Sequence, residues 1–292
     1  MEKIKLNNGI EMPSIGIGTY LLNPDEAEAS VLEALRVGYR LIDTANAYQN
    51  ERAVGRAIKR SGIPREEIFV ETKLWPSVYT DSEAIDKTLQ RLDLDYIDLL
   101  LLHQPAGDYI TGYKMMEKAL SEGKVRAIGI SNFYGERLDN LLNNATVMPA
   151  VNQVETHPYY PQNEMKEKLS PYGTKLQAWF PLGGRGNDSV LVEDSIRALS
   201  RKYNKSPAQI ILRWHNQKGV IVIPGSKNPE HIKDNLDIFD FTISDEDLSI
   251  IDSLDKNTPF YNQTEEALAG FANWAPDFDL QKDENLEYYD NL

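Results

Sequence analysis

The chain contains no cysteine among its 292 residues, so disulfide bonds, thiolate catalysis and cysteine-bound metal are excluded. Long apolar runs are also absent: no stretch approaches the roughly 18 apolar residues that a membrane helix requires. The opening residues, MEKIKLNNGI, lack the apolar run of a signal peptide. We therefore expect a soluble cytoplasmic protein.

Basic side chains are scarce relative to acidic ones. The chain has 31 Lys and Arg against 45 Asp and Glu, which gives a formal net charge of −14. This excess of negative charge argues against nucleic acid or an anionic membrane surface as the main partner. A small anionic ligand remains compatible with it, because a local basic pocket can exist in an acidic protein. We expect a small-molecule substrate.

What the sequence does contain is a regular alternation of two patterns. Helical stretches are predicted at 24–38, 81–94, 112–124 and 203–219. The first two begin at Pro or Asp, and the first, third and fourth finish at Gly or Lys; in the last, Ser206 is the expected N-cap. Eight β-branched or leucine-rich runs predict strands at 14–19, 39–43, 68–73, 96–103, 125–131, 149–155, 175–180 and 219–224. Strict alternation indicates a parallel sheet, and eight units in about 250 residues favour an α/β fold of the closed (β/α)8 TIM-barrel type.

The two ends of the chain depart from this alternation. Residues 3–13 predict a small β-hairpin that turns at Asn8-Gly9. After residue 255 the sequence becomes irregular and rich in aromatic residues, which we interpret as a folded C-terminal loop over the barrel mouth. Since no low-complexity linker interrupts the rest, residues 1–292 are predicted to form a single domain.

Polar residues close three consecutive predicted strands. Asp43, Lys73 and His103 are spaced 30 residues apart, one strand–helix unit each. In a parallel barrel this spacing puts all three at the C-terminal mouth, with Tyr48 in a short loop beside them. The next two strands end with further hydroxyl and amide groups, from Ser131, Asn132 and Gln153.

Each of these residues alone has a structural explanation: Asp43 as a helix cap, Lys73 as a solvated rim residue, His103 as a packed histidine and Tyr48 as a loop anchor. Their convergence at one mouth favours chemistry instead. A buried lysine requires a partner, which Asp43 supplies. The remaining positive field is expected to lower the pKa of Tyr48 from about 10, so that its phenol can act as an acid or base near neutrality.

Four longer segments resemble the signatures of the aldo-keto reductase family. They are GYRLIDTANAYQNERAVG, HQPAGDYITGYKMMEKALSEGKVRAIGISNF, AVNQVETHPYY and IVIPGSKNPEHIKDN, and the resemblance runs over roughly residues 3–280. It implies a metal-free, NAD(P)H-dependent alcohol dehydrogenase or carbonyl reductase that converts aldehydes and ketones to alcohols. Asp43, Tyr48, Lys73 and His103 match the family's catalytic residues, with Tyr48 as the general acid, and the resemblance favours a monomer.

The same resemblance assigns a cofactor site. Ser131, Asn132 and Gln153 would hold the nicotinamide carboxamide, and Trp179 would stack on the ring where the family usually has tyrosine. The other implied contacts are the cofactor edge (Gly18 and Thr19), the pyrophosphate (Leu182), the ribose and its 2′-phosphate (Ser226, Lys227, Asn228 and His231) and the adenine (Asp234 and Asn235).

Two departures from the family pattern concern specificity. Gly225 and His231 stand where the family commonly has Lys and Arg on the 2′-phosphate, so we expect NADP(H) as cofactor with NAD(H) also accepted. The substrate pocket is assigned to Tyr20, Trp75 and Gln104, with Phe260, Tyr261, Phe271 and Trp274 of the tail able to close it. We interpret this pocket as suited to small or polar carbonyl compounds.

Two other functions fit parts of the pattern. Lys73 could form a Schiff base in an aldolase on the same barrel, although the adjacent Asp43 would keep its amine charged. The chain could also be a nucleotide-binding redox-sensor module with little turnover, although the four intact catalytic residues argue against it.

Overall fold

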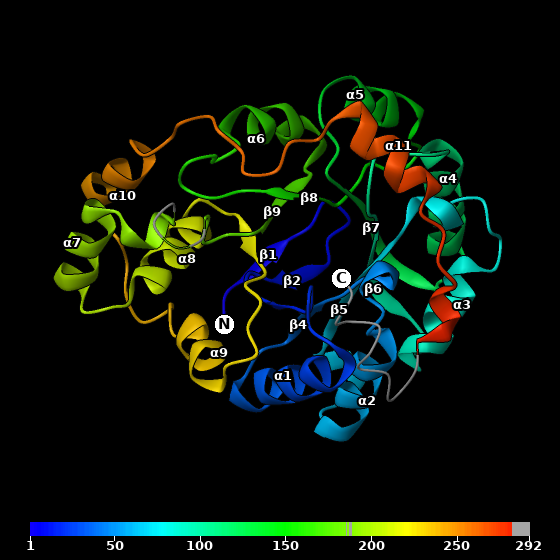
Figure 1. The fold of residues 1–292 in the computed structure, drawn as a ribbon, viewed down its shortest axis with the longest axis horizontal. Coiled ribbons are helices and arrows are strands. Elements are labelled where there is room, and N and C mark those ends of the chain that lie inside the picture. The colour runs from blue at the N-terminus through cyan, green and yellow to red at the C-terminus, as the bar shows by residue number, and fades with distance from the viewer. Residues whose placement is uncertain (185, 187–188, 282–292) are drawn as a thin grey trace.

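The computed structural model describes residues 1–184, 186 and 189–281, and the last residues of the predicted domain lie outside it. Its centre is a parallel eight-stranded sheet, ordered β10-β9-β8-β7-β6-β5-β4-β3. Parallel bridges from Ile15 to Val222 and from Gly18 to Gly225 join its two edges. The sheet is therefore closed, and the predicted (β/α)8 barrel is confirmed (Figure 1). The strands are β3 (Ile17–Gly18), β4 (Leu41–Asp43), β5 (Phe69–Leu74), β6 (Ile97–Leu102), β7 (Val125–Ser131), β8 (Val151–Glu155), β9 (Lys175–Trp179) and β10 (Ile221–Val222).

Helices surround this barrel as an outer layer (Figure 1). They are α1 (Pro24–Val37), α2 (Glu51–Ser61), α3 (Ala84–Leu92), α4 (Tyr109–Ser121), α5 (Gly135–Asn144), α6 (Asn163–Leu169), α7 (Asp194–Tyr203), α8 (Pro207–Gln217), α9 (Pro229–Leu236), α10 (Asp245–Asp252) and α11 (Glu265–Asn273). Ser206 caps α8 as predicted, accepting from the backbone N–H of Gln209 in a capping box. No helix in the described part of the chain combines the length and apolar character needed to cross a bilayer.

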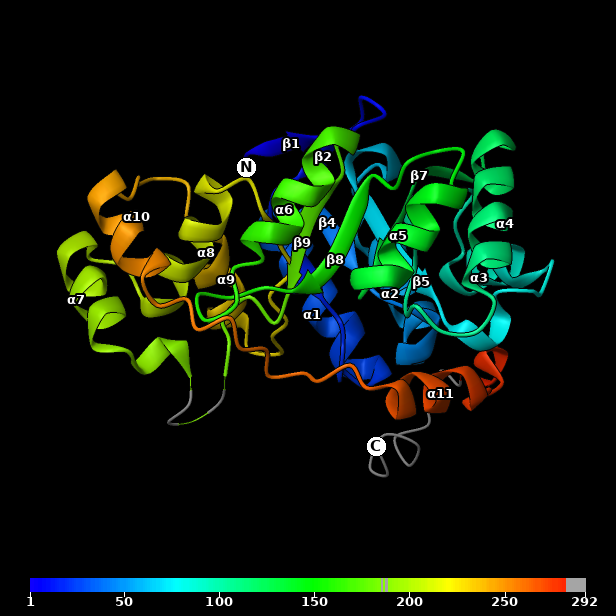
Figure 2. The ribbon, with the colours of Figure 1, turned by 90° about the horizontal axis from the view of Figure 1, so that it is seen from above.

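The two ends of the chain cover opposite ends of the barrel (Figure 2). At one end, β1 (Lys3–Lys5) pairs antiparallel with β2 (Glu11–Pro13). Gly9 takes a positive φ of 89° in the turn between them, which confirms the predicted hairpin. At the other end lies the tail with α11. The tail is more regular than its sequence indicated, because it contains helix α11, which begins at Glu265 and is capped by Thr264.

The hydrophobic core is divided by the barrel wall. One cluster lies between the strands and helices and includes Ile42, Val70 and Leu100. A second cluster contains the alternate residues Leu41, Phe69 and Leu99, together with Met12 and Leu6 of the hairpin. Because successive side chains of a strand point to opposite faces, this division assigns the second cluster to the barrel interior. Apolar residues therefore close the hairpin end and leave the other end for polar groups.

Helix α2 packs so closely on α3 that only glycine fits at position 55. A Cβ built on Gly55 would lie 2.2 Å from the carbonyl oxygen of Leu92, whereas one built on Gly270 of α11 would meet nothing within 4 Å. We predict that Gly55→Ala lowers the free energy of unfolding by about 1–3 kcal/mol despite the better helix propensity of alanine. Urea unfolding would measure this change. Gly270→Ala is the matched control, and we expect it to be neutral or stabilising by up to about 1 kcal/mol; a Gly55→Ala protein as stable as wild type would contradict the packing described.

Candidate active site

The barrel brings the four predicted catalytic side chains together at its C-terminal end. Asp43 is the last residue of β4, Lys73 lies near the end of β5, and His103 directly follows β6. Tyr48 ends a short 3₁₀ turn, Asn46–Tyr48, which follows β4. The ring of Tyr48 lies 5.5 Å from that of His103, so all four belong to one cluster.

Lys73 is the centre of this cluster and is fully buried. Its Nζ donates to Asp43 Oδ2 at 2.5 Å, to the carbonyl oxygen of Thr44 at 2.9 Å and to Tyr48 Oη at 3.2 Å. Three donors therefore meet three acceptors, which is the full capacity of an ammonium group. Burial opposes the charge of Lys73, but Asp43, Tyr48 and Glu71 together raise its pKa overall. A lysine held this way is charged and not nucleophilic, which disfavours Schiff-base chemistry.

The pKa of Tyr48 corrects one sequence-based expectation. Burial raises it above the ordinary value of 10, although Lys73 acts in the opposite direction. The sequence showed the ammonium but not the degree of burial, and burial is the larger effect. The phenol is therefore held protonated in this structure, a state in which it can donate a proton but not accept one.

His103 is also held in one protonation state. Burial, followed by the charge of Lys73, lowers its pKa well below 6.5, so the imidazole is neutral at pH 7. Its ring packs edge-on against Trp75 at a centroid distance of 5.1 Å. Its Nδ1 has no hydrogen-bond partner in the described structure. The neutral ring is thus fixed by packing, and its Nδ1 is left able to form a further hydrogen bond.

The residues predicted to hold a carboxamide are linked to one another. Ser131 Oγ donates to the carbonyl oxygen of Gln153 at 3.0 Å, and Asn132 Nδ2 contacts Ser131 Oγ at 3.1 Å. Asn132 has φ of 64°, a conformation that asparagine tolerates better than most residues. Its Oδ1 accepts from Trp179 Nε1 at 2.8 Å. The predicted stacking residue is therefore tied directly to the predicted amide-binding residues.

Two glycines of the site lie where the two edges of the sheet meet and close the barrel. A Cβ on Gly18 would lie 2.9 Å from the carbonyl oxygen of Ile223, and one on Gly225 would lie 3.0 Å from that of Gly18. Thr19 is buried beside them and donates through Oγ1 to the carbonyl oxygen of Asp43. Leu182, by contrast, is half-buried and packs on the hydrophobic core.

The second group of predicted cofactor residues lies around the start of α9. Asn228 caps this helix, and its Oδ1 accepts from the N–H of Glu230 at 2.9 Å. Ser226 Oγ accepts from the N–H of Asn228 at 3.1 Å. His231 and Asp234 are exposed, whereas Asn235 is buried.

Lys227, which the sequence offered as a compensating cation for a phosphate, already has a partner. Its Nζ donates to Glu26 Oε1 of α1 at 2.7 Å. Glu26 also completes the capping box of α1 with Asn23. Sequence analysis missed Glu26 because it stands 201 residues away, although the capping-box pattern marked it as a fixed carboxylate.

The predicted substrate residues take different positions. Tyr20 is 64% exposed, with its ring 5.1 Å from that of Tyr48. Trp75 is buried and contacts the rings of Phe271 and Trp274 from the tail. Gln104 is buried, with its backbone N–H and carbonyl held by Tyr79 Oη and its side-chain Oε1 unpartnered within the described structure.

The tail is attached to the barrel by a residue to which the sequence analysis assigned no role. Glu155, at the end of β8, accepts from the backbone N–H groups of Phe260 at 2.7 Å and Tyr261 at 3.0 Å. His157 Nε2 lies 2.9 Å from the same carboxylate. Gln263 adds a bond to the carbonyl oxygen of Asn132 at 2.9 Å. These contacts confirm that the tail covers the mouth.

Two further polar residues, Glu71 of β5 and Gln177 of β9, lie fully buried and joined by a hydrogen bond of 2.8 Å. The signal for Glu71 was present in the sequence, since a glutamate within an otherwise buried strand needs a partner. It stands two residues before Lys73 and therefore shares its face of β5.

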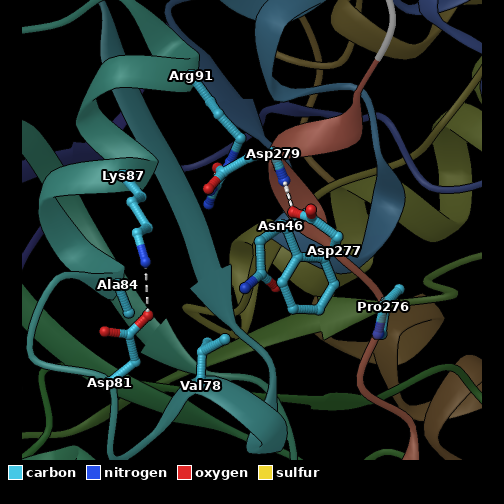
Figure 3. A pocket seen from close by; sticks show the side chains of 10 residues that line it. Asn46, Val78, Asp81, Ala84, Lys87, Arg91, Pro276, Asp277 and Asp279 are labelled. Carbon is cyan, nitrogen blue, oxygen red and sulfur yellow. Dashed lines mark hydrogen bonds and ion pairs between the residues drawn. The ribbon is translucent and has the colours of Figure 1, made fainter.

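A small cavity lies outside the mouth, between α3 and the tail (Figure 3). Its volume is about 110 Å³, and Arg91 and Lys87 line it opposite Asp279 and Asp277. Arg91 bonds to Asp279 at 2.7 Å and to the buried Glu51 at 2.6 Å. None of the predicted site residues lines this cavity, so we assign it to tail docking. Within the described residues, no group of three or more His, Cys, Asp or Glu side chains is arranged to bind a metal.

Comparison with known proteins agrees with this geometry. The model of the aldo/keto reductase family matches residues 14–256. Glyoxal reductase of Bacillus subtilis is 44% identical, covering 88% of this chain and 94% of its own length. Morphine 6-dehydrogenase of Pseudomonas putida is 42% identical, covering 86% and 90%. The crystal structure of a Bombyx mori aldo-keto reductase in complex with NADP is 33% identical, with a TM-score of 0.84 and coverage of 89% and 95%. The chain therefore belongs to the aldo/keto reductase family and is an oxidoreductase that acts on carbonyl groups.

Proposed function

We propose that the protein reduces small aldehydes and ketones, with Tyr48 as the general acid that protonates the carbonyl oxygen. One observation carries the assignment: Tyr48 Oη accepts a hydrogen bond from the Lys73 ammonium at 3.2 Å. With one lone pair engaged in this way, the phenol's own hydrogen is available to another acceptor. As the phenol gives up that hydrogen, the ammonium stabilises the developing phenolate.

The neutral imidazole of His103 would orient the substrate. It lies beside Tyr48, and burial together with the charge of Lys73 makes a positive charge on the ring unfavourable. A neutral imidazole can donate one hydrogen bond to a carbonyl oxygen without competing for the proton that Tyr48 delivers. Asp43, at 2.5 Å from Lys73, balances the ammonium and keeps it in place.

The rim of the mouth fits the cofactor of this family, NADP(H). When bound, this cofactor supplies the hydride for the carbonyl carbon. Ser131, Asn132 and Gln153 carry the hydroxyl and amide groups that a carboxamide needs, and the half-buried ring of Trp179 is held among them by its bond to Asn132. Gly18 and Gly225 leave the adjacent seam free of side-chain bulk.

The cofactor preference is expected to be relaxed, so that NADH is also used. Gly225 and His231 provide no bidentate clamp for a 2′-phosphate. Lys227 is neutralised by Glu26 at 2.7 Å, and the same contact lowers the pKa of the Glu26 carboxyl, which stays ionised at neutral pH. A fixed carboxylate at this position repels the 2′-phosphate of NADPH but not the free 2′-hydroxyl of NADH.

The substrate is expected to be small. Trp75 is packed between His103 and the tail residues Phe271 and Trp274, which narrows the approach from that side. The similarity to glyoxal reductase supports glyoxal, a two-carbon dicarbonyl compound, as the first candidate. We expect the protein to act as a monomer in the cytoplasm.

The role of Tyr48 is tested by Tyr48→Phe. We predict a fall in kcat of at least about a hundredfold with glyoxal and NADPH, because the proton donor is lost while the ring remains. Oxidation of NADPH followed at 340 nm measures kcat, and fluorescence titration checks that cofactor binding persists. Tyr172→Phe, at an exposed tyrosine, is the matched control. Turnover near that of wild type in Tyr48→Phe would remove Tyr48 from this role.

The cofactor preference is tested by Glu26→Gln, which retains the capping box because glutamine can replace glutamate there. We predict that the ratio of kcat/KM for NADPH to that for NADH rises by about three- to tenfold, because Lys227 is freed for the 2′-phosphate. Lys227→Ala should lower the same ratio. A wild-type preference for NADPH above about a thousandfold would refute the relaxed selectivity.

The protonation state of His103 predicts a pH effect on stability. Its pKa is lowered on folding, so below pH 6.5 the unfolded chain binds a proton that the folded protein does not. Stability is therefore present above pH 6.5 and is lost as the pH falls. Between pH 7 and pH 5 we predict that wild type loses about 1–2 kcal/mol more unfolding free energy than His103→Gln. Parallel losses in urea unfolding of the two proteins would show that His103 titrates normally.

A further inference from the structure

Beneath the catalytic residues lies a buried carboxyl group that the proposed reaction does not use. Glu71 is fully buried on β5, and in the register of β4 and β5 it is the partner of Asp43. Residues paired in parallel strands point to the same face. The carboxyl of Glu71 therefore lies in the barrel interior, below Lys73 and next to Asp43.

Gln153 connects this carboxyl to the mouth. Its Nε2 lies 2.6 Å from Glu71 Oε1, 3.0 Å from Asp43 Oδ2 and 3.1 Å from Gln177 Oε1. The second oxygen of Glu71 accepts from Gln177 Nε2 at 2.8 Å. These four side chains come from β4, β5, β8 and β9 and form one hydrogen-bonded layer across the barrel.

The count of hydrogens in this layer is informative. An amide nitrogen carries two hydrogens, but three acceptors surround the nitrogen of Gln153. The count of charges is also informative, because the described structure gives Lys73 an ion pair with Asp43 and gives Glu71 none. Two carboxylates in one dry site with a single cation are strongly unfavourable, so one of them retains a proton. Asp43 has the ammonium, which leaves Glu71 as the protonated acid.

We propose that Glu71 is a positioning residue that carries a proton and fixes the amide of Gln153 with its nitrogen inward and its oxygen toward the cofactor. The inward position is filled by the nitrogen, because Asp43 Oδ2 and Gln177 Oε1 are acceptors that carry no hydrogen of their own. The oxygen of Gln153 is then the atom that can receive a hydrogen from the nicotinamide carboxamide. This inference rests on the proposed function, since that function places the carboxamide at Gln153.

The direction of the Glu71 pKa agrees with this geometry. Burial, followed by the charge of Asp43, raises it well above 4.5, while Lys73 acts in the opposite direction. The second buried glutamate nearby provides a contrast. Glu51 is equally buried, but Arg91 Nε pairs with its Oε2 at 2.6 Å, and Thr72 Oγ1 donates to its Oε1 at 2.7 Å. Glu51 thus has a cationic partner, whereas the described structure gives Glu71 none.

The experiment compares Glu71→Leu with Glu71→Gln. Leucine removes the acceptors for Gln153, so we expect the dissociation constant of NADPH, measured by quenching of tryptophan fluorescence, to rise about tenfold or more. Glutamine is a neutral isostere and should keep the constant within about threefold of wild type. The infrared carbonyl band of a protonated carboxylic acid should be present in wild type and missing from Glu71→Gln.

Glu51→Gln is the matched control. It should lower Tm by several degrees because it leaves buried Arg91 short of a partner, and it should leave the NADPH dissociation constant unchanged. Unchanged affinity in Glu71→Leu, equal weakening in both Glu71 variants, or no difference in the acid band would each overturn the proposal. If Glu71→Leu does not fold, the affinity of Glu71→Gln and the acid band decide. The dissociation constant of NADPH measures binding alone. A protein that binds NADPH but reduces no carbonyl would therefore refute the proposed reaction and leave this test valid.

Discussion

The active site depends on one fully buried ammonium group. Lys73 has no access to water, and its stability there depends on three acceptors, from Asp43, Thr44 and Tyr48. Burial and then the same charge lower the pKa of His103, whereas on Tyr48 the charge opposes the effect of burial. The charge of Lys73 therefore acts on two neighbouring pKa values, and the strands β4 and β5 hold that charge in place by bringing Asp43 and Lys73 together.

Much of this arrangement could be predicted from the sequence, because it follows from regular spacing. Intervals of 30 residues between Asp43, Lys73 and His103 match one strand–helix unit, and parallel strands place such residues at one end of a barrel. Strand positions were predicted for the same reason, although β3 is shorter than expected, because Ile15 before it forms only an isolated bridge to Val222.

The remaining features depend on quantities that a sequence does not carry. The sign of the Tyr48 pKa shift required the degree of burial, which only the packed structure gives. The partner of Lys227 lies 201 residues away. The donors to Glu155 are backbone N–H groups, which do not depend on residue type. Long-range and backbone contacts of this kind are decided by tertiary packing and not by local pattern. The roles given to the site residues, Leu182 and His231 among them, remain predictions.

Asn132 joins parts of the molecule that act on different reactants. Its side chain holds the indole of Trp179 through Oδ1 and the carbonyl of His103 through Nδ2, and its own carbonyl receives the side chain of Gln263 from the tail. A bulky substrate that displaces the tail would break the bond from Gln263 to Asn132, and Asn132 also holds Trp179, the residue proposed to stack on the nicotinamide. On that proposal, the size of substrate accepted and the strength of cofactor binding are linked through Asn132.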